Sequence, residues 1–394
     1  MTPADVTIVV LNWNRRQETI ACIESLERAD LQGAKVMVVD NGSRDGSVEA
    51  LRARFPSLRV VALPENQGFA GGNNVGMRIA LDEGAGGVLL LNNDTEVAPD
   101  FLPPLVQALN DSPISGAVSS AIFRMDRRDM LDVAYCEVHL NQRHAVQLQG
   151  VNALPGLGYD KRREVQVVPG CSVLFKSEAL RTVGLFDEAY FAYHEDVDWC
   201  LRARDAGYQL FFEPFSRVFH LGSGTTGALR RRPDGVVKAI DPTDPNAEPL
   251  PWNPVRTYLG IRNTVRLVRA YANRGQKAAF ARACIRELPL EFSALLMNEA
   301  GLMRLGLWSY ERFAREYFVD RHPILRERPD GTLATLRRGL GFVVLPLADA
   351  LWCLPRDVVR AWRRGRFIEF REYLRGLRDG VLGRRLPLRR LGLR

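Results

Sequence analysis

The densest group of residues able to carry acid–base chemistry lies at 191–200, FAYHEDVDWC, where three carboxylates fall within four residues. Acidic residues at the start of a helix complement its dipole, so a purely structural role is one interpretation. Aromatic and apolar neighbours, however, suit a pocket that excludes water and raises the pKa of a carboxylate toward the range of a general base. We therefore favour a catalytic role for this segment.

Polar side chains also follow three short apolar runs, Val6–Leu11, Val36–Val39 and Val88–Leu91, which are typical of buried parallel strands. Helical segments expected between the runs give an alternation that predicts an α/β fold with a doubly wound, mostly parallel sheet. Ligands of such sheets bind at the carboxyl ends of the strands. The side chains expected at these ends are Asn12 and Asn14, Asp40, and Asn92, Asn93 and Asp94.

Two carboxylates stand out at this predicted edge. Asp40 could accept a hydrogen bond from a base N–H or a ribose hydroxyl, although Asp-Asn-Gly is also a good turn sequence. Asp94 supplies a carboxylate of the kind that a divalent cation bridging a pyrophosphate needs, although it could also be an exposed strand end. A lone histidine such as His220 is more often structural, and its case as a metal ligand depends on Asp94 needing a partner.

The stretch at 66–74, NQGFAGGNN, would bring bare backbone and amide groups near a ligand at a helix N-terminus, which suits phosphate. The stretch follows the third predicted strand and lacks the Gly-x-Gly-x-x-Gly spacing. This argues against an ordinary dinucleotide site.

The chain also divides into regions of different character. Residues 231–254 are rich in Pro, Asp and Arg without periodicity, which predicts a flexible loop. We expect a catalytic domain at 1–230, whose first half, at about 1–112, carries the polar strand ends that would bind a ligand and whose second half, at about 113–230, carries the acidic cluster. Within the latter, residues 115–175 should form shorter strands and loops, and a mainly helical region should follow at 255–394.

Six segments in one order resemble glycosyltransferase family 2, of GT-A fold, and especially its bacterial rhamnosyltransferase-like branch. They are VTIVVLNWN at the start, VVDNGSRDGS at 38–47, ENQGFAGGNNVG at 65–76, LLLNNDTE at 89–96, VGLFDEAYFAYHEDVDWCLRARDAGY at 183–208 and HLGSGTTG at 220–227. The resemblance covers about residues 5–227 and, more weakly, YLGIRNTVRLVRAYA at 258–272.

The resemblance implies a nucleoside-diphosphate sugar donor, with Asp40 contacting the nucleoside. Asn92-Asn93-Asp94 takes the place of the family's Asp-x-Asp motif, with the neutral Asn92 where the first Asp would be. Metal binding would therefore fall mainly on Asp94, with His220 as a second ligand of Mg²⁺ or Mn²⁺, which neutralises the leaving diphosphate. The full donor-binding set implied is Asn12, Asn14, Asp40, Asn66, Gly68, Gly71, Asn73, Asn92 and Asn93.

On the acceptor side, Asp196 matches the family's catalytic base, which implies a single displacement that inverts the configuration of the sugar. Glu195, His194 and Trp199 would bind the acceptor, a saccharide that we expect to be lipid-linked, in bacterial cell-surface polysaccharide synthesis. The first candidate donor is dTDP-rhamnose, and UDP-galactofuranose or another hexose donor stays open. More distant alternatives are a nucleotide-dependent oxidoreductase and an inactive glycosyltransferase-like scaffold. The sequence does not indicate the linkage or the oligomeric state.

Composition is that of a globular protein, with 46% hydrophobic and 25% charged residues in 394. Six scattered cysteines with no Cys-x-x-Cys pair, and no visible signal peptide, favour a cytoplasmic setting without disulfides.

The net charge of +8 is concentrated near the C-terminus, where residues 356–394 hold thirteen Arg against four acids. The apolar stretch Leu340–Leu354 is too short to span a bilayer. An apolar stripe follows, flanked by Arg363, Arg364, Arg371, Arg375 and Arg378, and consists of Phe367, Phe370, Leu374, Leu377 and Val381. It predicts a helix on anionic lipid at the inner membrane face or, with equal weight, a helix packed on its own catalytic domain or a dimer partner. No motif accompanies the charge that would indicate nucleic-acid binding.

Overall fold

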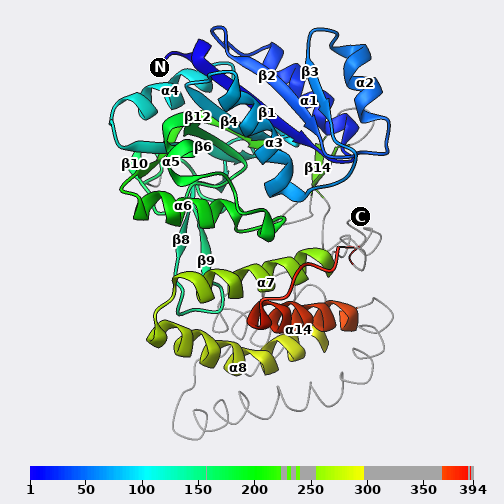
Figure 1. The fold of residues 1–394 in the computed structure, drawn as a ribbon, viewed down its shortest axis with the longest axis vertical. Coiled ribbons are helices and arrows are strands. Elements are labelled where there is room, and N and C mark those ends of the chain that lie inside the picture. The colour runs from blue at the N-terminus through cyan, green and yellow to red at the C-terminus, as the bar shows by residue number, and fades with distance from the viewer. Residues whose placement is uncertain are drawn as a thin grey trace, which may run out of the picture.

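The computed structural model describes residues 1–156, 158–222, 229–231, 237–239, 254–296, 366–388 and 391. At its centre lies a mixed sheet whose main path runs β10-β12-β6-β11-β4-β1-β2-β3, with β5 paired to β12 and β7 to β6 (Figure 1). The strands are β1 Val6–Asn12, β2 Lys35–Asp40, β3 Arg59–Ala62, β4 Gly87–Asn92, β5 Thr95–Val97, β6 Ser115–Arg124, β7 Leu131–Val133, β10 Arg163–Glu164, β11 Ser172–Lys176 and β12 Gln209–His220.

The first half of the sheet follows the predicted alternation. Strands β3, β2, β1 and β4 are parallel neighbours, and both faces of the sheet are covered by helices. Alternate residues of β1 enter different cores: Val9 packs on the side of α3, and Ile8 and Val10 pack on the side of α1. The helices of this half are α1 Arg16–Glu27, α2 Ser47–Arg54, α3 Gly68–Asp82 and α4 Leu102–Asn110. Burial on both faces explains the uninterrupted apolar runs.

The second half departs from the prediction of short strands and loops at 115–175. β6 is a ten-residue strand, almost wholly buried between β11 and β12. β12 extends from Gln209 to His220, with an irregular register around Pro214, where a missing N–H is tolerated. β11 runs antiparallel to β4. Between β11 and β12 the chain forms α5 Ser177–Val183, the 3₁₀ turn η2 Glu188–Tyr190 and α6 Glu195–Asp205.

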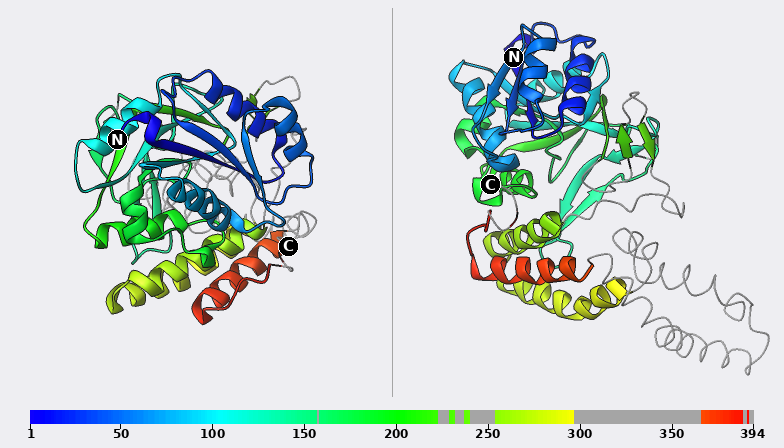
Figure 2. Two further views of the ribbon diagram at one scale, coloured as in Figure 1. Left: turned by 45° about the horizontal axis from the view of Figure 1, so that its top comes forward. Right: turned by 90° about the vertical axis from the view of Figure 1, so that its right-hand side faces the viewer.

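Three helices of the C-terminal region lie below the sheet in Figures 1 and 2: α7 Pro254–Tyr271, α8 Arg274–Leu296 and α14 Arg366–Leu382. α14 packs directly along α7, and two glycines allow the close approach. A Cβ at Gly376 would lie 2.5 Å from the Tyr258 carbonyl oxygen, and one at Gly380 would lie 2.9 Å from that of Arg262. A hairpin of β8 Tyr135–Val138 and β9 Val146–Gln149 reaches down from the catalytic domain to these helices.

The apolar stripe predicted for the tail is divided between two faces of α14. Phe370 and Leu377 are half-buried, whereas Leu374 and Val381 are 40% and 58% exposed. Tyr373 and Gly376 lie on the face of α14 that packs on the rest of the chain. The predicted packing of this helix on its own chain therefore applies to one of its sides, and the other side is exposed.

Other predictions for the second half fall on residues that the structure does not describe. Residues 231–254 lie outside the described part apart from Arg231, the short strand β14 Val237–Ala239, which pairs with β13 Leu229–Arg231, and the first residue of α7. Leu340–Leu354, Arg363 and Arg364 also lie outside it. Among the described helices, none combines the length and the apolar character needed to cross a membrane.

Candidate active site

The polar ends of β1, β2 and β4 meet at one edge of the sheet. Asn12 lies opposite Asp40, and Leu11 lies opposite Asn92. β11 begins at this edge because it runs antiparallel to β4, and β12 ends near it at His220. The parallel register therefore brings together the strand ends in which the sequence predicted a ligand site.

Asn12 and Asp40 are buried at this edge, with 0% and 1% exposure, and they bond to each other. The Asn12 Nδ2 atom lies 2.7 Å from Asp40 Oδ2, and the Ser43 backbone N–H donates to Asp40 Oδ1 at 2.9 Å. Asn93 donates to Asn12 Oδ1 at 3.1 Å. The Asn12 amide is therefore bonded within the protein, and its contact with a donor stays a prediction. Asn14 stays exposed at the rim, and Asn92 is half-buried.

The glycine-rich stretch at 66–74 also faces protein. A Cβ at Gly68, whose φ is +79°, would lie 2.4 Å from the Phe191 carbonyl oxygen, and one at Gly71 would lie 2.9 Å from Gln67. Asn66 accepts hydrogen bonds from Asn41 and from the Gly68 backbone, and Asn73 bonds within its own helix. In this structure these four residues contact protein, and their small size and polarity serve the packing of α3 on the loop before α6. Their role toward a donor stays a prediction.

Asp94 and His220 come together as predicted. The Leu221 N–H donates to the Asp94 carbonyl, and the side chains approach to 3.3 Å between His220 Nε2 and Asp94 Oδ1. The second ring nitrogen, Nδ1, lies 2.8 Å from Asp132 Oδ2 on β7. Burial lowers the pKa of His220, but the carboxylates of Asp94 and Asp132 help to raise it well above its usual value.

Asp196 lies in the first turn of α6 and is half-buried. Its Oδ2 accepts from the Gly170 N–H at 2.9 Å, and its Oδ1 accepts from the Val197 N–H at 2.8 Å. Burial raises the pKa of Asp196 despite these bonds. Glu195 beside it is 4% exposed, burial raises its pKa well above the usual value, and its Oε2 has no hydrogen-bond partner among the described residues.

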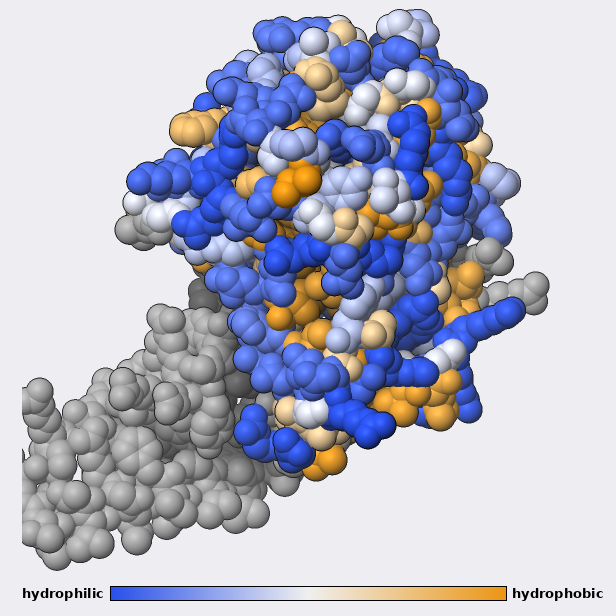
Figure 3. Space-filling model, turned by 60° about the vertical axis from the view of Figure 1, so that its left-hand side comes forward, coloured by the Kyte–Doolittle hydropathy of each residue, from blue (hydrophilic) through white to orange (hydrophobic). Residues whose placement is uncertain are grey.

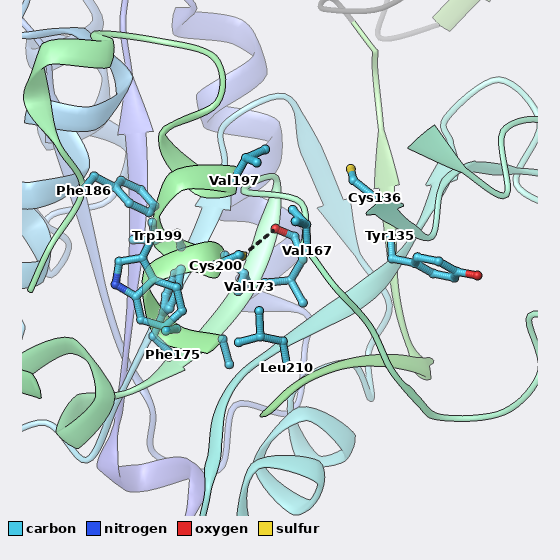
Figure 4. Packing of buried hydrophobic residues seen from close by; sticks show 14 of the residues in the cluster. Tyr135, Cys136, Val167, Val173, Phe175, Phe186, Val197, Trp199, Cys200 and Leu210 are labelled. Carbon is cyan, nitrogen blue, oxygen red and sulfur yellow. Dashed lines mark hydrogen bonds between the residues drawn. The ribbon is translucent and has the colours of Figure 1, made fainter. Parts of the chain in front are cut away.

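Two of the residues predicted to bind the acceptor face elsewhere. Trp199 is fully buried: its ring packs edge-on against Phe175 at 4.6 Å, and its Nε1 donates to the Gly184 carbonyl (Figure 4). The prediction for Trp199 is wrong because helical spacing turns that position into the core beneath α6. The His194 ring lies 3.1 Å from Thr264 Oγ1 on α7, and burial lowers its pKa to about 4.

Three further residues at the site were not predicted. Trp13, directly after β1, is 42% exposed and follows the strand end at the ligand edge. Asp132 pairs with the His220 ring, and Asn263 donates hydrogen bonds to the loop before α6. Both residues come from distant parts of the chain. The exposed aromatic in LNWN was a usable signal, whereas nothing local in the sequence marks Asp132 or Asn263.

A cavity of about 430 Å³ lies between η2 and α6 on one side and α7 and α14 on the other. Asp187, Tyr190 and Asp198 line it together with Arg262, Arg266 and Arg269. Asp40, Asp94 and Asp196 do not line it, so this cavity is separate from the candidate site.

Comparisons with known proteins agree with the fold and with a glycosyltransferase activity. Residues 7–154 match the sequence model of glycosyl transferase family 2. The chain is 29% identical over 230 residues to the N-acetylglucosaminyl-diphospho-decaprenol L-rhamnosyltransferase of Mycobacterium tuberculosis, covering 52% of this chain and 72% of the relative. It is 22% identical over 267 residues to the dTDP-rhamnosyl transferase RfbF of Shigella flexneri, covering 68% of this chain and 80% of the relative.

A solved structure of GalNAc-T7 with UDP, GalNAc and Mn²⁺ has the same kind of fold, with a TM-score of 0.51 at 15% identity. The match covers 80% of this chain and 57% of that one. The expected GT-A fold is confirmed. The chain therefore carries a glycosyltransferase family 2 domain and is a nucleotide-sugar glycosyltransferase, similar to the rhamnosyltransferases of that family.

Proposed function

We propose that the chain is an inverting, metal-dependent rhamnosyltransferase that uses dTDP-rhamnose and a lipid-linked saccharide acceptor. The observation that best supports this reaction type is Asp196, a half-buried carboxylate that two backbone N–H groups hold beside the ligand edge of the sheet. The choice of sugar and acceptor is supported by two relatives, an N-acetylglucosaminyl-diphospho-decaprenol L-rhamnosyltransferase and a dTDP-rhamnosyl transferase.

Asp196 would act as the general base. The two backbone hydrogen bonds fix the position of its oxygens. Its raised pKa makes the carboxylate a stronger base, which favours transfer of the proton from the attacking hydroxyl. As the acceptor oxygen forms its bond to the anomeric carbon, the hydroxyl proton passes to Asp196 and the bond to the diphosphate oxygen breaks. One displacement from the far face inverts the configuration and leaves no sugar attached to the protein.

The residues at the end of β4 fit a divalent cation. Asp94 Oδ1 and His220 Nε2 lie 3.3 Å apart, and Asp132 holds the other ring nitrogen of His220. A carboxylate that accepts from one imidazole nitrogen fixes the tautomer that leaves the other nitrogen able to ligate metal. Mg²⁺ or Mn²⁺ bound by Asp94 and His220 would neutralise the leaving diphosphate.

The exposed side of α14 supports peripheral association with the inner face of the membrane. Leu374, Val381 and Leu382 are 40 to 58% exposed, with Arg371 and Arg378 also exposed on this helix. Figure 3 shows apolar side chains emerging among hydrophilic ones at the lower end of the molecule, where the C-terminal helices lie. Apolar groups flanked by arginine suit an anionic lipid surface, which would also present a lipid-linked acceptor.

The test is transfer by the purified chain from a panel of nucleotide sugars, in the presence of Mn²⁺, to a short-chain N-acetylglucosaminyl-diphospho-lipid. We expect dTDP-L-rhamnose to give product, and NMR of that product to show inversion at the transferred anomeric carbon. Product from UDP-galactofuranose or another hexose donor alone would replace the proposed donor. Retention of configuration would overturn the proposed chemistry.

A further inference from the structure

The loop that precedes Asp196 has an unusual backbone. Of the six non-glycine residues with left-handed φ in the described part of the chain, three are Phe191, Tyr193 and His194, at +65°, +69° and +71°. Phe191, with ψ of −61°, forms a γ-turn that is closed by a 2.8 Å bond from the Ala192 N–H to the Tyr190 carbonyl. Such conformations are rare for residues with a side chain and persist only where neighbours hold them.

One side chain of α7 holds this loop. The Asn263 Nδ2 atom lies 2.9 Å from the Tyr190 carbonyl oxygen and 2.8 Å from those of Ala192 and Tyr193. The side-chain amide of Asn263 has two N–H groups, and the three carbonyl oxygens around it use its full capacity to donate hydrogen bonds. Asn263 is 0% exposed, and its own Oδ1 accepts from Arg262 Nη1 at 2.8 Å.

Neighbouring residues of α7 extend the same contact. Arg262 donates to the Ala189 carbonyl, and Arg266 forms an ion pair with Asp187. On the other side of the loop, the Ala70 N–H of α3 donates to the Phe191 carbonyl at 3.0 Å. The loop is thus held between the glycine-rich start of α3 and the C-terminal helix α7, and α6 with Asp196 begins where the loop ends.

We propose that Asn263 is a positioning residue, which sets the place of Asp196 by fixing the backbone of residues 190–193. The inference rests on the proposed role of Asp196 as base, and it makes α7 part of the catalytic machinery. A misplacement of about 1 Å at a reacting group costs on the order of 100-fold in rate. Releasing the loop should therefore lower kcat without disturbing the nucleotide end of the site.

The experiment compares Asn263→Leu, which removes the donors at similar size, with Val265→Ala as a matched control. Val265 is also buried and lies two positions further along α7, but it faces α14 instead of the loop. We expect Asn263→Leu to lower kcat about 100-fold with dTDP binding within threefold of wild type. The acid limb of its pH–rate profile should shift, because a released loop changes the solvation of Asp196. Val265→Ala should lower Tm and leave kcat and the pH profile unchanged.

A double-mutant cycle with Asp196→Asn tests whether Asn263 acts through Asp196. In that background, Asn263→Leu should reduce the residual rate by less than about threefold, because the group being positioned is already gone. Should Asn263→Leu fail to fold, Asn263→Ser keeps one donor, and faster hydrogen exchange at amides 190–194 then reports the release of the loop directly.

Two results would overturn the inference, and they are distinguishable. Equal kcat and pH profiles in Asn263→Leu and Val265→Ala, with Asp196→Asn inactive, would remove the positioning role and leave the proposed function standing. Full activity of Asp196→Asn would remove the proposed base itself, and with it the role assigned to Asn263.

Discussion

The two sides of the candidate site are built in opposite ways. On the side proposed to bind the donor, Asn12, Asp40 and Asn93 hold one another at neighbouring strand ends of a parallel sheet. On the acceptor side, the loop before Asp196 carries three left-handed residues and is held by Asn263, about seventy positions further along the chain. The sheet thus makes the donor edge rigid by itself, whereas the acid-bearing segment depends on the C-terminal helices. Changes at the donor edge should therefore act on nucleotide binding, and changes at the loop or the helices should act on rate and stability.

The largest effect that would test the donor side is loss of metal-dependent nucleotide binding. Asp94→Ala should weaken the binding of dTDP in Mn²⁺ by more than about 100-fold, and His220→Ala somewhat less. Asp132→Asn should weaken it by about 10- to 100-fold, as is usual when the partner of a ligating histidine is lost. Calorimetric titration of Mn²⁺ and dTDP measures these changes, with Asp126→Asn, which touches Arg124 instead of His220, as the control. Unchanged metal requirement in the first two variants would refute the assigned ligands.

The contact between the two sides is tested at Gly68. Gly68→Ala adds a methyl group 2.4 Å from the Phe191 carbonyl oxygen at a φ of +79°, and it should destabilise the fold by about 3 kcal/mol. Gly84→Ala is the matched control, because Gly84 has a φ of +80° with nothing within 4 Å of its added Cβ. Chemical denaturation compares the two. If both variants lose the same stability, only backbone strain matters, and α3 does not support the loop.

The sequence predicts the strand ends of the sheet better than the packing around the loop before α6. The strand ends at Asn12, Asp40 and Asp94 could be predicted because buried strands have a local pattern and parallel strands end together. Asp196 was found by its motif, but Trp199 was misassigned because its neighbours in sequence say nothing about which way a helix turns it. Gly68 and Gly71 suggested a phosphate cradle, since a glycine needed for close packing looks the same as one needed for a ligand. The support from Asp132 and Asn263 depends on long-range folding and leaves no local signal.

The buried imidazole next to the loop predicts a pH dependence of stability. The pKa of His194 is lowered to about 4, below its ordinary value of about 6.5, so the unfolded chain binds the extra proton first as pH falls. Stability from this group is therefore complete above pH 6.5 and is lost as pH falls toward 4, by about 3 kcal/mol. His194→Asn suits the left-handed backbone and should flatten this part of the curve. Denaturation midpoints between pH 4 and pH 7 measure it, and parallel curves for the two proteins would contradict the assignment.

The smallest effect concerns the exposed face of α14. Leu374→Glu with Val381→Glu should reduce binding to anionic vesicles several-fold and leave Tm unchanged, because both side chains are exposed. Ile114→Glu, at an exposed site on the catalytic domain, is the control. Binding to vesicles should also weaken as salt rises. Deletion of 356–394 is less informative, since α14 packs on α7 and its loss should lower Tm and all activities together. Vesicle binding that neither the double variant nor salt alters would refute the membrane face.

The central claim is that Asp196 is the base of a sugar transfer and takes no part in holding the nucleotide. Single-turnover transfer by Asp196→Asn, measured with dTDP affinity on the same preparation, tests this claim most directly. We expect transfer to fall by about 10²- to 10⁴-fold while the affinity for dTDP in Mn²⁺ stays within threefold of wild type. Transfer above about a tenth of the wild-type rate, or a parallel loss of nucleotide binding, would contradict the account.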